Sequence, residues 1–387
     1  MNLTLLFPQL RHPAIEERYA RWQSELLVRR SAAGAPAIVY EPEDAASEIL
    51  GDVSSEFVLV VTEPLIVPPP DAPLRLIAAL EQHPELVAAV PVMNESDNPH
   101  QRRSPPVPYL TLRQFEDTSA LIASEAGLGI VRAWDGSDPG MYLARTGALR
   151  SSAAPLSAVL DGSDVVIATD IYAHRYSSHR GQLRQDLLDR IPNEAKRVLE
   201  FGCGEAALGY ALKQRQKCRV VGIELDPDAA AVAAQRLDAV HSGDVRNLVD
   251  IIDERFEWIV GGDILEHLDE PWTFLADLRK LAAPGGQLLL SVPNVGSWPI
   301  VVDLLRGRFD YVYMGITCAG HLRFFTRTTI EEMLQISGWS VVSIDPQDSF
   351  ITPEYQKFEE GLTRAGIPHS REDLLTTGFY ITARNEG

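Results

Sequence analysis

The sequence predicts a two-domain α/β protein whose C-terminal domain is built on a mainly parallel sheet. First, from about residue 197 short apolar segments alternate with helical ones, which is typical of parallel βα units. Second, the part before residue 177 is richer in proline, as in the run 68–70, which excludes helix interiors and central strands there. Third, 387 residues are enough for two hydrophobic cores. We therefore predict a smaller domain over residues 1–176 and a second domain over residues 177–387.

Composition and charge limit the partners of the chain. The formal charge is −19 and the isoelectric point about 4.9, which argues against binding to nucleic acid or to an anionic membrane. No apolar run reaches the length of about 18 residues that a membrane-spanning helix needs, and the N-terminus lacks the features of a signal peptide. The three cysteines show neither metal-ligand spacing nor a disulfide framework. We therefore expect a cytoplasmic protein without a membrane span.

The most informative motif is the stretch R-V-L-E-F-G-C-G-E-A at residues 197–206. An apolar strand runs into Glu200, then into a turn with Gly202 and Gly204, and a helix is expected over residues 206–212. Such a turn presents backbone N–H groups at the carboxyl end of the strand, so a ligand can lie directly on it. A dinucleotide-binding turn or a plain tight turn has the same pattern, so the motif alone leaves these alternatives open.

Acidic residues follow at the ends of the next segments. A second strand ends at Glu224, 20 residues after Gly204, about where a carboxylate meets ribose hydroxyls. Asp244 follows a third short segment, and Asp263 ends a fourth strand within residues 256–268. Residues 281–294 then read as a helix end, a Pro-Gly-Gly turn and a fifth strand.

This ordered series resembles the class I S-adenosyl-L-methionine (SAM)-dependent methyltransferases, and the run H-L-R-F-F-T at 321–326 resembles their ubiquinone-biosynthesis-like branch. The resemblance covers roughly residues 176–345. It implies a Rossmann-like mixed sheet of seven strands, SAM as cofactor and no metal. It implies that the cofactor-binding residues are Glu200, Gly202, Cys203, Gly204, Glu224, Leu225, Asp244, Val245 and Asp263.

The resemblance also implies roles for these residues. The two glycines approach the methionine part and the ribose, and Glu224 accepts hydrogen bonds from the ribose hydroxyls, with Asp226 as a rival. Asp244 and the backbone of Val245 contact the adenine, although Asp244 could instead cap a turn. Asp263 holds the methionine amino group. Cys203 is expected to be a small buried residue of the turn, not a nucleophile.

Two histidines compete for the role of the base that removes a proton from the acceptor. His267 follows the fourth strand, and His321 begins the later motif. A histidine neutral near pH 7 suits this task, but either side chain could equally be a wall residue. The sequence departs from relatives at Ala206, where many have a third glycine, and at Cys318 and Gly320, where Asp and Thr are common.

The N-terminal domain has a second resemblance. The segment 56–94 (a strand, a proline-rich turn, a helix and a strand) is similar to the middle of family 2 (GT-A type) glycosyltransferases. Where that family carries Asp-x-Asp to hold a metal, this chain has Val61-Thr62-Glu63, and one carboxylate cannot reproduce such a site. We expect a degenerate GT-A-like α/β domain with a structural or substrate-docking role.

The function that follows is SAM-dependent methyl transfer, directed to an oxygen of a sugar-containing (glycan) or small-molecule hydroxylated acceptor. One alternative is a bifunctional glycosyltransferase–methyltransferase, and another is a non-catalytic scaffold that keeps a SAM-type fold. The oligomeric state stays open, with a homo-oligomer among the alternatives.

Overall fold

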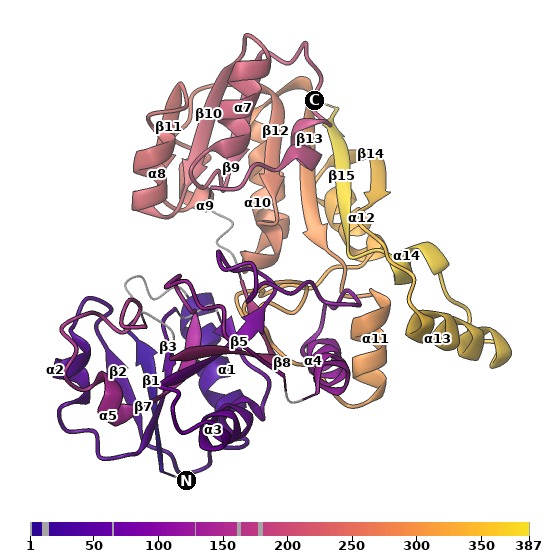
Figure 1. Cartoon of the computed structure of the whole chain (residues 1–387). Coiled ribbons are helices and arrows are strands. Elements are labelled where there is room, and N and C mark those ends of the chain that lie inside the picture. The colour runs from indigo at the N-terminus through magenta and orange to yellow at the C-terminus, as the bar shows by residue number, and fades with distance from the viewer. Residues whose placement is uncertain are drawn as a thin grey trace. The chain divides into compact units, whose positions relative to one another are not determined.

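The computed structural model describes residues 2–9, 15–63, 66–127, 129–160, 164–176 and 181–386, without the side chains of 15–20. The chain forms two compact units, which are drawn in Figure 1. Unit 1 comprises Met1–Ser177 and Asp310–Ala319, and unit 2 comprises Ser178–Phe309 and Gly320–Gly387. The sequence-based boundary at 176/177 adjoins residues 177–180, which lie outside the described part. Segment 310–319 belongs to unit 1, although the sequence analysis assigned it to the second domain.

Unit 1 is built on a mixed sheet. Its elements are β1 (Leu3–Pro8), α1 (Ile15–Arg29), β2 (Ala37–Tyr40), α2 (Ala46–Leu50), β3 (Phe57–Val61), β4 (Ile66–Val67), α3 (Ala72–Gln82), β5 (Ala88–Met93), α4 (Leu112–Ala126), β6 (Ile130–Val131), β7 (Met141–Arg145), α5 (Thr146–Leu149) and β8 (Val165–Arg175). The strand order is β2-β1-β3-β7-β5-β8-β4, and β6 pairs with β8. Strand β7 runs antiparallel between β3 and β5, whereas β1, β2 and β3 are parallel to one another.

Both faces of this sheet are covered. Along β1, Leu3 and Leu5 belong to one hydrophobic core and Leu6 to another. Successive side chains of a strand point to opposite faces, so apolar residues at every position indicate burial on both sides. The apolar run F-V-L-V-V predicts a buried strand over residues 57–61, and the structure confirms both these bounds and the burial on two sides.

Unit 2 contains a second sheet with helices on its faces (Figure 1). Its elements are α6 (Gln185–Leu188), β9 (Arg197–Phe201), α7 (Ala207–Arg215), β10 (Arg219–Glu224), α8 (Pro227–Ala233), β11 (Ala239–Ser242), α9 (Val245–Leu248), β12 (Phe256–Gly262), η1 (Leu265–His267), α10 (Pro271–Leu278), η2 (Arg279–Leu281), β13 (Ala282–Pro293), α11 (Trp298–Leu305), α12 (Arg327–Ile336), β14 (Trp339–Pro346), α13 (Pro353–Arg364), α14 (Arg371–Leu375) and β15 (Gly378–Asn385). The order is β11-β10-β9-β12-β13-β15-β14. Strands β9 to β13 are parallel, and β15 is antiparallel to both of its neighbours. This is the Rossmann-like α/β sheet of seven strands that the resemblance implied.

Two local predictions for unit 2 need correction. Residues 182–190 (Q-L-R-Q-D-L-L-D-R), followed by Pro192, predict a helix that opens the second domain, but the structure has only the single turn α6 there. The Pro-Gly-Gly segment 284–286 does not precede its strand but lies inside β13. The register with β12 shifts there, and Gly285 has a φ of 72°, so the segment forms an irregularity in the strand. Among the helices of the described part, none is both long and apolar enough to cross a bilayer.

Candidate functional site

The predicted glycine turn lies where β9 ends and α7 begins. Gly202 and Gly204 have φ values of 66° and 53°, in the left-handed region that glycine enters without steric cost. A Cβ atom at Gly202 would overlap the side chain of Ile264, the residue after Asp263. The turn is therefore built for glycine, and it lies against the end of β12.

Glu224, at the end of β10, is fixed beside this turn. Its Oε2 accepts a hydrogen bond from the backbone N–H of Gly204 (2.7 Å), and its Oε1 accepts one from Asp226 (2.9 Å). A carboxylate offers about four lone-pair sites, so two more are available for donors on a ligand. The side chain of Asp226 instead caps α8, where it accepts from the N–H groups of Asp228 and Ala229. The geometry thus favours Glu224 over Asp226 as the residue that accepts hydrogen bonds from a ribose. Leu225, the next residue, is 70% exposed.

Asp244 and Val245 lie next to Glu224, because the N–H of Gly243 donates to the Glu224 carbonyl (2.8 Å). Asp244 caps α9 by accepting from the N–H of Arg246 (2.9 Å). The Arg246 guanidinium also bonds this carboxylate, and this contact lowers the pKa of Asp244. The side chain of Val245 is buried, so this residue has only backbone groups to offer a ligand.

Asp263 is paired with a residue that the sequence analysis missed. Arg184 donates from Nη1 to Asp263 Oδ2 (2.5 Å), and the Ser291 hydroxyl donates to Asp263 Oδ1 (2.8 Å). Asp263 also has a φ of 55°, uncommon for a non-glycine residue and frequent at functional sites. A guanidinium held at the carboxyl end of β12 is suited to bind a carboxylate.

Glu200 and Cys203 lie behind the turn. Glu200 is buried, and its Oε2 accepts from the N–H of Gly209 in α7 (3.0 Å). Burial raises the pKa of Glu200 to about 8. Burial also raises the pKa of the Cys203 thiol, which keeps it protonated and agrees with a packing role. Both residues therefore support the turn from inside the unit.

The two candidate bases lie side by side. The rings of His267 and His321 are 4.9 Å apart and nearly perpendicular. His267 Nδ1 is 3.1 Å from the carbonyl oxygen of Gly320, and His321 Nε2 is 4.0 Å from Oε1 of Glu266. Two residues that lie more than 50 positions apart in the chain are thus brought into one cluster.

Glu266 is the buried member of this cluster. It is 0% exposed, and within the described part of the chain neither of its carboxylate oxygens has a hydrogen-bond partner. Burial raises the pKa of this carboxyl group well above its ordinary value. One ligand atom each from Glu266, His267 and His321 lie within 4.8 Å of one another, so the three groups could hold a metal ion. Two imidazoles and a carboxylate are a ligand set that Zn²⁺ accepts, whereas the sequence analysis expected no metal.

The sequence offers residues 297–298, 309–314 and 324–325 as further walls of an acceptor pocket, because aromatic side chains there could stack on a sugar or a ring, but the structure gives them different places. Trp298 and Phe325 are core residues, with 1% and 4% exposure. Phe309 and Phe324 pack edge to face in unit 2, with ring centroids 5.5 Å apart. Residues 310–314 are part of unit 1.

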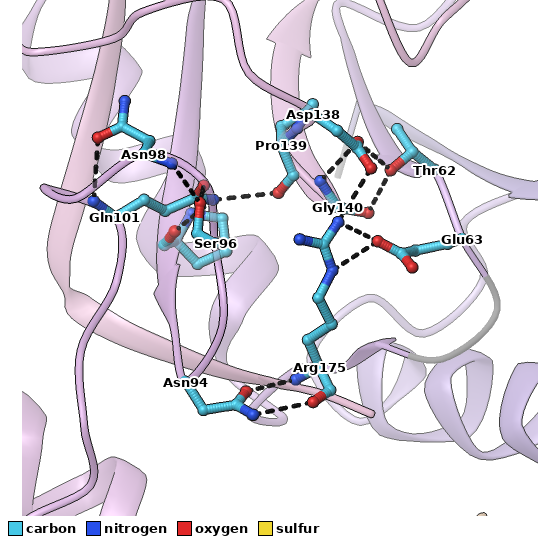
Figure 2. Close-up of polar contacts among 11 residues, drawn as sticks. Thr62, Glu63, Asn94, Ser96, Asn98, Gln101, Asp138, Pro139, Gly140 and Arg175 are labelled. Carbon is cyan, nitrogen blue, oxygen red and sulfur yellow. Dashed lines mark hydrogen bonds and ion pairs between the residues drawn. The ribbon is translucent and has the colours of Figure 1, made fainter. Parts of the chain in front are cut away.

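In unit 1, the position of the missing acidic pair is occupied by a charge network (Figure 2). Arg175 bonds the Glu63 carboxylate through Nε (2.6 Å) and through Nη2, which also reaches Asp138 (2.9 Å). The hydroxyl of Thr62 bonds Asp138 as well (3.0 Å). Asn94 holds the backbone of Arg175 through both groups of its amide. A guanidinium thus lies between the two carboxylates at the end of β3.

These features can be set beside known proteins. Residues 172–344 match the family model described as "Methyltransferase domain". The C-terminal half of the chain contains a methyltransferase domain.

Curated relatives of this domain carry the name ubiquinone biosynthesis O-methyltransferase. The protein of that name from Cereibacter sphaeroides is 32% identical over 171 residues, which are 42% of this chain and 66% of the relative. The one from Xylella fastidiosa is 34% identical over 140 residues, which are 32% of this chain and 56% of the relative. The chain thus spans slightly less than two thirds of the length of the first of these relatives. A crystal structure of a SAM-dependent methyltransferase from Archaeoglobus fulgidus aligns with 52% of this chain and 91% of its own, at 16% identity and a TM-score of 0.40.

The methyltransferase domain gathers the predicted donor residues at one edge of its sheet. Gly202, Glu224, Asp244 and Asp263 lie at or just after the carboxyl ends of the neighbouring strands β9, β10, β11 and β12. Ligands of open parallel sheets bind at this edge. Arg184 was missed because it lies in an irregular segment with no motif of its own.

Proposed function

We propose that unit 2 transfers the methyl group of SAM to an oxygen atom of a small hydroxylated or sugar-containing acceptor. The observation that carries this proposal is the Glu224 carboxylate, fixed on the glycine turn by the N–H of Gly204 with lone pairs left for ribose hydroxyls. The match to the methyltransferase domain family supports it. SAM, when bound, supplies a methyl group already activated on a sulfonium centre. The chain then has to bind, orient the acceptor and remove its proton.

The donor side can be assigned residue by residue. Glu224 accepts from the ribose, and Asp244 with the backbone of Val245 binds the adenine. Asp263 accepts from the methionine amino group, and Arg184 beside it donates to the methionine carboxylate. Arg184 lies between the carboxylates of Asp263 and Asp186, so this place offers a positive group to the carboxylate and negative groups to the amino group of an amino acid moiety.

His267 is the base in this proposal. The Gly320 carbonyl can only accept a hydrogen bond, so Nδ1 of His267 carries the hydrogen and Nε2 keeps its lone pair. That lone pair can take the proton of an acceptor hydroxyl. His321 faces the Glu266 carboxyl and is the alternative base. Methyl transfer by His267→Asn and His321→Asn distinguishes them, because removal of the base also removes the acidic limb of the pH–rate profile.

The first experiment is calorimetric titration of the full chain with S-adenosylhomocysteine. Micromolar binding is expected, and Glu224→Ala should weaken it beyond detection. Asp226→Ala is the matched control, because it removes a neighbouring carboxylate that caps α8. Unchanged affinity in Glu224→Ala would sink the site assignment.

The acceptor class rests on two supports. The relatives' printed name includes O-methyltransferase, which favours an oxygen atom as the methylated position. The GT-A-like pattern of unit 1 favours a sugar or a glycosylated molecule. Methylation of a broad panel of hydroxylated metabolites and glycans, followed by mass spectrometry, tests both.

For unit 1 we propose a degenerate GT-A-like domain with a structural or docking role. The Arg175 guanidinium between Glu63 and Asp138 supports this, because a divalent cation there would face a fixed positive charge. The bifunctional alternative requires metal-dependent nucleotide-sugar binding by unit 1. The bifunctional alternative is ruled out if titration of the chain with a nucleotide sugar and Mn²⁺ releases no heat.

The cellular location of the protein, its oligomeric state and the scaffold alternative are also proposals. All three cysteines lie in the described part and none forms a disulfide, which suits the cytoplasm. A homo-oligomer is tested by light scattering. The scaffold alternative predicts a folded chain that transfers no methyl group to any member of the acceptor panel.

A further inference from the structure

One segment of the chain leaves unit 2 and returns to it. Residues 310–319, here named the returning segment, are preceded and followed in sequence by residues of unit 2 but are part of unit 1. The chain therefore crosses between the units after residues 177, 309 and 319.

The returning segment is an ordered turn, not a loose connection. The N–H of Val312 donates to the Thr317 carbonyl (3.0 Å), and the N–H of Ala319 donates to the Val312 carbonyl (2.9 Å). The Thr317 hydroxyl closes the turn on the Asp310 carbonyl (2.8 Å), and the Cys318 thiol bonds the Tyr313 carbonyl (3.0 Å). Thr317 and Cys318 are both at most 5% exposed.

Unit 1 holds this turn by three different contacts. Val312 is 4% exposed and belongs to the same hydrophobic core as Val60 of β3. Gln23 of α1, itself 3% exposed, donates from its side-chain amide to the Tyr311 carbonyl (2.8 Å). The ring of Tyr313 packs 5.4 Å from that of Tyr176, just after β8. Helix α1, the sheet and the residue just after β8 therefore all hold the segment in unit 1.

Both ends of the returning segment adjoin the candidate acceptor site. Phe309, just before it, packs on Phe324. Gly320, just after it, presents its carbonyl to His267, and His321 is the next residue. Consecutive Cα atoms are about 3.8 Å apart, so the position of Ala319 limits where Gly320, and after it His321, can lie.

We propose that unit 1 is a positioning domain for methyl transfer: by holding the returning segment, it fixes Gly320 and His321 against His267. Gln23, Val312 and Tyr313 are positioning residues that act through the backbone. The inference rests on the proposed function of unit 2 for the role of the histidines. It gives unit 1 a task that needs no nucleotide sugar and no metal.

The test uses variants of the full chain. Gln23→Leu removes the hydrogen bond to the segment, and Val312→Ala takes volume from the core that holds it. Gln101→Leu is the matched control, because this buried glutamine of unit 1 donates to the carbonyl of Pro91 and to that of Pro139, which Figure 2 labels.

Three quantities are measured on each variant. Peptide-resolved iodoacetamide labelling gives the rate at Cys318, with buried Cys203 as internal reference. NMR spectra at one fixed pH, with the imidazole signals assigned by His267→Asn and His321→Asn, report whether the contact between the two rings is kept. Calorimetry gives the affinity for S-adenosylhomocysteine.

In Gln23→Leu and Val312→Ala, labelling of Cys318 should rise about fivefold to tenfold, the change in a local opening equilibrium expected for one lost buried contact. The chemical shifts of the His267 and His321 imidazoles should change with it, whereas the affinity for S-adenosylhomocysteine and all values of Gln101→Leu stay as in the wild type. Faster labelling with unchanged imidazole signals, or equal effects in Gln101→Leu, would overturn the proposal. Failure of the wild type to bind S-adenosylhomocysteine would instead refute the proposed function, because the labelling and the imidazole spectra need no donor.

Discussion

Substitution of Glu200 by Gln should change how the stability of the protein depends on pH. The carboxyl group of Glu200 is buried behind the glycine turn, and burial raises its pKa from 4.5 to about 8. An acid with a higher pKa in the folded than in the unfolded chain binds its proton more tightly when folded. The favourable contribution of Glu200 to the free energy of unfolding is therefore complete below pH 4.5 and is lost as the pH rises through about 8.

The size of the effect follows from this shift. Each pH unit between the two pKa values corresponds to about 1.4 kcal/mol, so the wild type should lose about 5 kcal/mol through this group between pH 4.5 and 8. Gln cannot ionise, and its amide oxygen can still accept the N–H of Gly209. The free energy of unfolding of Glu200→Gln, relative to the wild type, should therefore increase steadily with pH.

Urea unfolding of both proteins at several pH values between 4.5 and 8.5 measures this difference. Comparison at each pH cancels the contribution of all other titrating groups. Glu257→Gln is the control, because this carboxylate also accepts a backbone N–H (from Lys196, 2.8 Å) but its side chain is 38% exposed. A difference for Glu200→Gln that stays constant across the pH range would refute the reasoning.

Three further variants test the two sites. Ala206→Gly should stabilise the protein by up to about 1 kcal/mol in urea unfolding, because Ala206 has a φ of 60°, which glycine adopts without strain. Gly202→Ala should cost about 2 kcal/mol or more and abolish binding of S-adenosylhomocysteine, since the added methyl group overlaps Ile264; a variant that binds normally would contradict the described turn. Calorimetric titration with Zn²⁺ should show binding that His321→Asn weakens at least about tenfold, and an absence of binding to the wild type would rule out the set of Glu266, His267 and His321 as a metal site.

The parts of the fold that the sequence predicted are those with a local cause. The strand at 57–61 is an unbroken apolar run, and the turn at 202–204 needs glycine at two fixed positions. The pairing of Arg184 with Asp263 joins residues 79 positions apart, and that of Arg175 with Glu63 joins residues 112 apart. Neither arginine has a periodicity or a motif, so only the tertiary fold reveals its partner. The Pro-Gly-Gly segment was misplaced because the same residues suit a turn and a strand irregularity.

The returning segment also governs the order in which the protein can fold during its synthesis. The core of unit 1 includes Val312, so this core is incomplete when residue 177 leaves the ribosome. Residues 178–309 must be synthesised before the missing piece arrives, although N-terminal domains generally fold first as the chain emerges. Of the two units, unit 1 is therefore begun first but is complete only when residue 319 has been synthesised, and a gene fragment that ends at residue 177 encodes unit 1 without the Val312 side chain of its core.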